Sequence, residues 1–170
     1  MSESVLCVRH DELDEATLED IVAIKSEHWA YPAESQKKWI RENIKADDLH
    51  LIVKEDCDTV AYLSICNVEL IIDGKKENAL GIGSVCVSKK YLGMGKGKRI
   101  VLLANEQIKK KNGLGVLLCH DALVDFYRRC NWGSVYYDKA VLAEKDFNDN
   151  IMLLQDFDIR VKEIIIDRNF

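Results

Sequence analysis

The stretch that decides the fold is Val85–Arg99, which reads VCVSKKYLGMGKGKR. An apolar strand ends here, three glycines alternate with other residues, and a helical pattern begins. The first turn of a helix presents unpaired backbone N–H groups and the positive end of the helix dipole. Glycines let successive N–H groups converge on one anion because no Cβ stands in the way. The stretch therefore predicts a pyrophosphate cradle, and Lys96, Lys98 and Arg99 are expected to add positive charge there.

Two common nucleotide-binding loops do not match these glycines. A Walker loop needs G-x-x-x-x-G-K-[ST], whereas the spacing here is G-x-G-x-G. A Rossmann loop needs G-x-G-x-x-G inside a βαβ unit, whereas antiparallel strands are expected before this loop. A flexible turn before a helix is the remaining alternative. Three alternating glycines with lysines next to them in the sequence disfavour a plain turn.

Hydrophobic periodicity and turn signals predict the other elements of the chain. The expected strands are residues 4–9, 48–55, 59–72, 77–89, 114–119, 133–139 and 150–155. The expected helices are residues 14–28, 34–44, 97–111 and 122–130, the last with Asp121 as its N-cap. Asp73-Gly74 indicates a hairpin because both residues tolerate positive φ. Val161–Ile166 fits either a strand or a docked helix. This order predicts an α+β fold with a central mixed, mostly antiparallel sheet flanked by helices.

Composition narrows the class of protein. The chain has 170 residues and 48% hydrophobic content, which predicts one compact domain over residues 1–170. The net charge of −5, from 24 basic and 29 acidic residues, disfavours a nucleic-acid binder. No apolar run approaches the about 20 residues that a membrane helix requires, and Met1–Ser4 does not begin a secretory signal. A cytoplasmic protein without a membrane partner is therefore expected.

The six cysteines give no sign of a metal or redox site. None forms a C-x-x-C pair, and none has zinc-ligand spacing to a histidine. Most lie in apolar runs, which predicts buried free thiols in a reducing compartment. No metal is expected.

The glycine loop resembles that of the GCN5-related N-acetyltransferase (GNAT) family, which reads Gln/Arg-x-x-Gly-x-Gly/Ala. The match is Leu92–Gly97, with Gly95 and Gly97 on the motif glycines and Leu92 at the Gln/Arg position. The resemblance covers about residues 48–140. It implies an acyl-CoA N-acyltransferase fold that uses acetyl-CoA as cosubstrate, with the pantetheine arm between splayed strands at 84–88 and 115–119. The implied cofactor-binding residues are Val85, Cys86, Val87, Leu92, Gly93, Met94, Gly95, Lys96, Gly97 and Lys98.

A second resemblance to this family lies in His120–Trp132, HDALVDFYRRCNW. Family members commonly show Asn-x-x-Ala-x-x-Phe/Leu-Tyr, then a basic pair and Gly-Phe or Gly-Trp. Tyr127 falls on the tyrosine, which implies that its hydroxyl protonates the departing coenzyme A thiolate. Asn131 replaces the usual glycine and also tolerates left-handed geometry. Taken alone, Tyr127 would be interpreted as an aromatic residue packed on a helix face. Because it follows the glycine loop at the separation seen in the family, the catalytic role is favoured.

The proton acceptor is harder to find. Amine attack on a thioester requires a neutral amine, and many relatives place a glutamate on the strand before the loop. The matching stretch, Gly81–Cys86, has no carboxylate. The remaining candidates, acting through water, are Glu69, Glu77, His28 and His120. His120 titrates near neutral pH and is the second predicted catalytic residue, with a hydrogen bond to backbone as the alternative.

The acceptor site is expected at His28-Trp29-Ala30-Tyr31-Pro32, a region that often walls this site in the family. An aromatic wall with one polar group suits a small ligand. His28, Trp29 and Tyr31 are therefore the predicted substrate-binding residues. The alternative is a helix end that packs on the core.

Together these features predict an N-acetyltransferase that moves an acetyl group from acetyl-CoA to a primary amine of a small molecule. The amine would attack directly in a ternary complex, with a main-chain N–H near Val85–Val87 polarising the thioester carbonyl. The segment around Tyr127 also resembles aminoglycoside acetyltransferases. The alternatives are a non-catalytic acyl-CoA-binding or regulatory module, and a protein N-terminal or lysine acetyltransferase. A homodimer is a further expectation that the sequence leaves open.

Overall fold

The computed structural model describes residues 2–111 and 113–170. Contacts divide the chain into two units. Unit 1 contains Met1–Cys66, Gly83–Ala104 and Phe170, and unit 2 contains Asn67–Ile82 and Asn105–Asn169. Two long strands and one helix pass from one unit into the other, so neither unit is a continuous segment of the chain.

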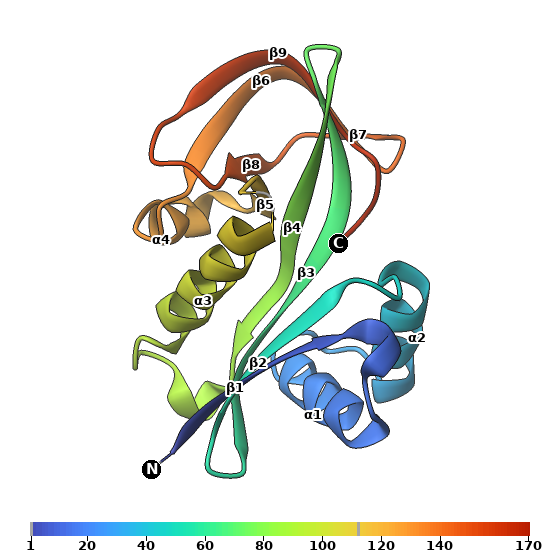
Figure 1. Cartoon of the computed structure of the whole chain (residues 1–170), viewed down its shortest axis with the longest axis vertical. Coiled ribbons are helices and arrows are strands. Elements are labelled where there is room, and N and C mark those ends of the chain that lie inside the picture. Colours follow the sequence, from blue (N-terminus) through green and yellow to red (C-terminus); the bar gives the residue numbers. More distant parts are fainter. Residues whose placement is uncertain (1, 112) are drawn as a thin grey trace. The chain divides into compact units, whose positions relative to one another are not determined.

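Unit 1 holds four neighbouring strands in the order β1-β2-β3-β4 (Figure 1). They are β1 (Glu3–Arg9), β2 (Leu49–Glu55), the first part of β3 (Asp58–Ile72) and the last part of β4 (Lys75–Val87). β1 runs antiparallel to β2, and β2 runs antiparallel to β3 with a bulge between Val53 and Lys54. The centre of β3 is buried at every residue from Val60 to Cys66, all of which are apolar except Ser64.

Two helices of unit 1 lie side by side in Figure 1. α1 (Glu15–Ser26) begins after Asp14, whose carboxylate accepts a 2.7 Å hydrogen bond from the Thr17 amide. It ends two residues before the predicted end at 28. α2 (Ala33–Asn43) begins after the extended Pro32 and buries Gln36 and Ile40.

A third helix, α3 (Lys96–Lys111), follows the short 3₁₀ turn η2 (Lys89–Tyr91). It runs from unit 1 into unit 2. Its apolar pattern predicts Ile100, Leu103, Ala104 and Ile108 on the inward face, of which Leu103 is only half-buried and the other three are fully buried. Gly113 follows it with φ +81° and donates its amide to the Ile108 carbonyl at 3.0 Å. This left-handed glycine closes the helix end.

The sheet of unit 2 is mixed and mostly antiparallel, as predicted. β5 (Gly115–Cys119) runs parallel to β4 at Leu80–Ile82 and antiparallel to β8 (Asn150–Leu153). β6 (Gly133–Leu142) runs antiparallel to β7 (Lys145–Phe147) and β8 but parallel to β9 (Ile159–Ile166). Asp73 and Gly74 have φ of 48° and 82°, which confirms the predicted β3–β4 hairpin.

The structure corrects several predictions in the C-terminal half. The ambiguous Val161–Ile166 segment is strand β9, and β7 was not predicted because three residues are too short to show periodicity. The helix predicted at 122–130 is a 3₁₀ turn, η3 (Asp121–Leu123), followed by the short α4 (Val124–Arg128). Asp121 is not its N-cap, because its carboxylate instead accepts a 2.7 Å hydrogen bond from the side-chain Nδ2 of Asn150.

The cysteine prediction is only partly right. All six are free thiols, and Cys66, Cys86, Cys119 and Cys130 are buried. Cys7 and Cys57 are exposed, because one lies on the edge strand β1 and the other in the turn between β2 and β3. Among the described residues, none of the helices combines the length and the apolar content that crossing a bilayer requires.

Candidate functional site

The glycine loop of unit 1 has backbone geometry suited to an anion. Gly93 and Gly95 have φ of +76° and +77°, and a Cβ added to either would meet nothing within 4 Å. The Gly95 carbonyl accepts the Arg99 amide at 3.0 Å, so the helical hydrogen bonds begin there. The amides of Lys96, Gly97 and Lys98 precede that first bond and therefore lack helical acceptors. An open loop with unpaired amides at a helix start fits a pyrophosphate.

Two of the three cationic side chains of this loop form ion pairs that the sequence does not predict. The Lys96 ammonium forms an ion pair with Glu55 and lies 3.8 Å from Glu3, and the Arg99 guanidinium lies 2.8 Å from Glu3. Both cations therefore lie against acidic residues of β1 and β2, and their contribution to binding a phosphate stays a prediction. Lys98 is exposed and has no ion pair among the described residues. Lys98 and the backbone amides are the positive groups of this loop for which the structure shows no acidic partner among the described residues.

Gly95→Ala is expected to lower the affinity for acetyl-CoA about 10-fold. An L-residue with left-handed φ is disfavoured by about 1–2 kcal/mol, so the loop relaxes and its amides turn away from the anion. Isothermal titration would measure the change. Gly74→Ala is the matched control, because Gly74 also has positive φ (+82°) and open space around it but lies in the β3–β4 hairpin. An equal loss of affinity in both variants would contradict a specific role for the loop.

The strand that precedes the loop is tied to the end of α1. Val87 accepts a 2.5 Å hydrogen bond at its carbonyl from Nε2 of His28, so two predicted site residues are in contact. The Glu27 carboxylate accepts hydrogen bonds from the Lys89 amide at 2.6 Å and the Ser88 hydroxyl at 3.2 Å. Burial raises the pKa of the Cys86 thiol to about 12, so this residue is an uncharged thiol at neutral pH.

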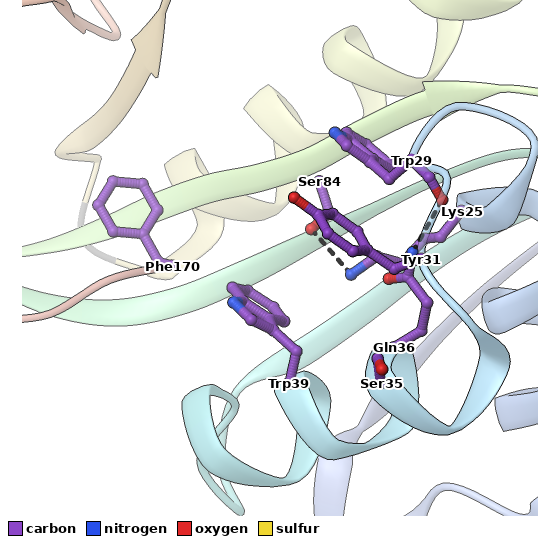
Figure 2. A pocket seen from close by; sticks show the side chains of 8 residues that line it. All are labelled: Lys25, Trp29, Tyr31, Ser35, Gln36, Trp39, Ser84 and Phe170. Carbon is purple, nitrogen blue, oxygen red and sulfur yellow. Dashed lines mark hydrogen bonds between the residues drawn. The ribbon is translucent and has the colours of Figure 1, made fainter.

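A cavity of about 370 Å³ opens between α1, α2 and β4 within unit 1 (Figure 2). Trp29 and Tyr31, both predicted to bind substrate, line it, whereas His28 is not among its lining residues. The other lining residues are Lys25, Ser35, Gln36, Trp39, Ser84 and Phe170. Gln36 fixes the wall by donating a 3.2 Å hydrogen bond to the Trp29 carbonyl. The volume lies within the range of small-ligand sites.

Sequence reasoning missed Lys25 and Ser84 in this cavity. A signal for Lys25 was present, because it follows Leu18 by seven residues and so lies on the same helix face as Ile21 and Val22. A lysine on the apolar face of a helix is unusual. Ser84 could not have been predicted. Its φ of 52° is a local irregularity of β4, and a serine in a strand gives no sequence signal for such a conformation.

Tyr127 lies on α4 in unit 2. Its side chain is 6% exposed and packs edge-on against Phe126, with ring centroids 5.0 Å apart. Burial raises the pKa of Tyr127 well above its ordinary value, so the phenol keeps its proton at neutral pH. Among the described residues, none forms a hydrogen bond with this hydroxyl. The group can therefore donate to a ligand.

A buried network holds the segment after α4. Asn131 has φ of 70°, which confirms the predicted left-handed geometry, and the Trp132 amide returns to the Tyr127 carbonyl at 3.1 Å. The Trp132 indole donates to Asn105 Oδ1 at 2.9 Å, and Asn105 Nδ2 donates to the Cys130 carbonyl at 2.8 Å. These bonds fix the position of Tyr127 within unit 2.

The remaining base candidates of unit 2 lie in polar surroundings. His120 is exposed and its Nδ1 contacts the Asp149 carboxylate. Glu69 pairs with Lys76 at 3.0 Å, and Glu77 pairs with Lys75 at 2.9 Å. In residues 2–111 and 113–170, no group of three or more His, Cys, Asp or Glu side chains could hold a metal ion.

A sequence model of the acetyltransferase (GNAT) family matches residues 13–132. The chain belongs to the GNAT family. This confirms the predicted resemblance to the family, and membership supports acetyl-CoA-dependent N-acetyl transfer at the level of the family. A comparison with curated proteins found no match to this sequence.

Solved structures show the same fold. An acyl-CoA N-acyltransferase from Pseudomonas aeruginosa is 18% identical with a TM-score of 0.66, covering 89% of this chain and 99% of its own. A GNAT acetyltransferase from Brucella melitensis in complex with acetyl-CoA is 18% identical with a TM-score of 0.54. The match covers 76% of this chain and 82% of that protein. A GCN5-related N-acetyltransferase from Kribbella flavida is 19% identical with a TM-score of 0.61, and the match covers 77% of this chain. This chain spans 34% of the length of that protein.

Proposed function

We propose that this GNAT chain transfers the acetyl group of acetyl-CoA to a primary amine of a small molecule by direct attack in a ternary complex. The observation that carries the proposal is the start of α3, where Gly93 and Gly95 of the preceding loop take positive φ and three amides of the first turn lack helical acceptors. Acetyl-CoA supplies the activated acyl group as a thioester. We also propose that residues 1–170 form one GNAT-type domain.

The proposed roles follow from the groups available. The amides of Lys96, Gly97 and Lys98 bind the pyrophosphate. Main-chain groups of Val85–Val87 bind the pantetheine arm, and an N–H there polarises the thioester carbonyl. Tyr127 protonates the coenzyme A thiolate, and His120 remains a candidate for proton transfer.

The aromatic cavity of unit 1 supports a small acceptor. Trp29, Tyr31 and Trp39 give it an apolar wall, and its volume of about 370 Å³ holds a small ligand. We propose a cytoplasmic enzyme that acts without nucleic acid or membrane. A homodimer remains compatible with this proposal.

Two measurements test the proposed function. Millimolar acetyl-CoA should raise the melting temperature, because a ligand that binds only the folded state stabilises it. A panel of small primary amines should then release free coenzyme A thiol in steady state. Binding without turnover would favour the non-catalytic module, and turnover only with peptides would favour a protein acetyltransferase. Failure of acetyl-CoA to raise the melting temperature would contradict the proposal as a whole.

A further inference from the structure

Lys25 is the one charged side chain among the described residues that line the aromatic cavity of unit 1. It is 4% exposed, and its Nζ donates a 3.3 Å hydrogen bond to Ser84 Oγ. The same nitrogen lies 4.5 Å from the ring centroid of Trp39 and 5.8 Å from that of Trp29 (Figure 2). A hydroxyl acceptor and two aromatic rings suit an ammonium ion. The cavity therefore presents a positive charge.

The ammonium lacks the anion that a buried cation needs. In the described part of the chain, no acidic group forms an ion pair with Nζ of Lys25. Removing a cation from water without an anionic partner is unfavourable, and burial lowers the pKa of Lys25 accordingly. An anion in the cavity would offset this cost, because a nearby opposite charge favours the ammonium. An ammonium has three N–H donors and Ser84 accepts from one, so donors remain for a ligand.

Ser84 supplies a further donor at the same place. Its Oγ accepts from Lys25, and across residues 2–111 and 113–170 its own hydroxyl hydrogen has no acceptor. Ser84 also has φ of 52°, a backbone conformation that non-glycine residues avoid and that is concentrated at ligand-binding sites. Nζ of Lys25 and Oγ of Ser84 thus offer two neighbouring donors, one of them charged. A carboxylate matches this pair, because each of its oxygens can accept one hydrogen bond.

The charge of Lys25 also limits where the acceptor can carry its own cation. A second ammonium beside Nζ would be repelled, and the rings of Trp29 and Trp39 that could stabilise it already face Lys25. The reacting amine must therefore lie on a part of the acceptor away from Nζ. The same repulsion disfavours polycationic acceptors such as the aminoglycosides that the segment around Tyr127 suggests.

We infer that the cavity binds the carboxylate of the acceptor, so that the acceptors are amino carboxylates with an apolar or aromatic body. Nζ of Lys25 and Oγ of Ser84 bind the carboxylate, and the rings of Trp29 and Trp39 contact the body. The inference rests on the proposed function and deepens it by naming the substrate class. Lys25 is a binding residue in this scheme, and it takes no part in proton transfer.

Binding is tested apart from turnover with two ligands that share one aromatic body. Phenylpropionate has a carboxylate and no amine, whereas phenethylamine has an amine and no carboxylate. By isothermal titration, wild type should bind phenylpropionate at least about 10-fold more tightly, the usual effect of a hydrogen bond between charged groups. Lys25→Met should weaken the binding of phenylpropionate about 10-fold and leave phenethylamine unchanged or tighter.

The matched control is Lys37→Met, which removes a lysine of α2 that pairs with Glu19 at 2.5 Å and does not line the cavity. Its affinity for both ligands should equal that of wild type. Acetyl-CoA should raise the melting temperature of both variants as it does that of wild type, which shows that they are folded.

Turnover is tested with pairs of amines that differ only by a carboxylate. The pairs are phenylalanine with phenethylamine, tryptophan with tryptamine, and leucine with isoamylamine. Wild type should have a kcat/KM at least about 10-fold higher for the member that carries the carboxylate, and Lys25→Met should abolish this preference.

The outcomes separate this inference from the proposed function. A higher kcat/KM for the amines without a carboxylate would overturn the inference and leave the proposed function standing. Equal affinity of wild type and Lys25→Met for phenylpropionate would overturn the inference whatever the activity. If phenylpropionate binds as expected but no amine is acetylated, the carboxylate site stands and the proposed function fails.

Discussion

Tyr127→Phe is expected to lower kcat about 100-fold while the affinity for acetyl-CoA stays near the wild-type value. The substitution removes only a hydroxyl that is proposed to protonate the coenzyme A thiolate, and general acids of this kind contribute at least about 100-fold. The ring is 6% exposed and packs against Phe126, so phenylalanine preserves the packing of α4. Steady-state release of thiol and isothermal titration with acetyl-CoA would measure the two quantities.

The raised pKa of Tyr127 adds a pH criterion to this prediction. Because burial holds the pKa well above its ordinary value, the phenol stays protonated as the pH rises through neutral and mildly alkaline values. Ionisation of Tyr127 should therefore cause no decline of kcat in that range. Tyr136→Phe removes the hydroxyl of a half-exposed tyrosine on β6 and serves as the control. Undiminished turnover in Tyr127→Phe would exclude the proposed acid role.

Features that depend on local chemistry were predictable from sequence. Asp73-Gly74 and Gly113 have the positive φ that their turns require, and Asn131 takes the left-handed geometry expected of a glycine substitute. The loop Leu92–Gly97 was recognised for the same reason, since alternating glycines mark backbone conformations that other residues avoid. These signals lie within a few residues of the structure that they specify.

Features that depend on contacts distant in sequence were not predictable. Lys96 looks like a phosphate ligand in the sequence, but its ammonium forms an ion pair with Glu55, 41 residues earlier. Lys25 looks like an ordinary helix lysine, but it is buried because Trp29, Trp39 and Ser84 close around it. The last strand, β9, pairs with β6 and β3, so the pairing that makes it a strand lies outside its own segment. In each case the deciding partner comes from another element.

A second large effect concerns His50, which is fully buried on β2 in unit 1. Its Nδ1 lies 2.8 Å from the Tyr62 hydroxyl, and its Nε2 lies 3.0 Å from Nδ1 of His10. The neutral ring can satisfy both contacts by accepting from Tyr62 and donating to His10. Burial, with smaller effects from His10 and Lys25, lowers the pKa of His50 from 6.5 to about 4.

This shift makes the fold sensitive to acid. Between pH 6.5 and about 4 the unfolded chain binds a proton at His50 that the folded chain excludes, so stability falls as the pH falls. The free energy of unfolding should therefore drop by about 3 kcal/mol through His50 between pH 7 and pH 4. His50→Gln keeps a polar side chain of similar reach but does not titrate. Urea unfolding at several pH values should show wild type losing about 3 kcal/mol more than His50→Gln over this interval.

The control for this effect is His28→Gln, which alters an exposed histidine of the same unit and should leave the acid sensitivity as in wild type. Parallel pH profiles for wild type and His50→Gln would show that His50 accepts a proton without unfolding. In that case His10 and Tyr62 would have to reorganise around a charged ring, because a charged imidazole donates from both nitrogens.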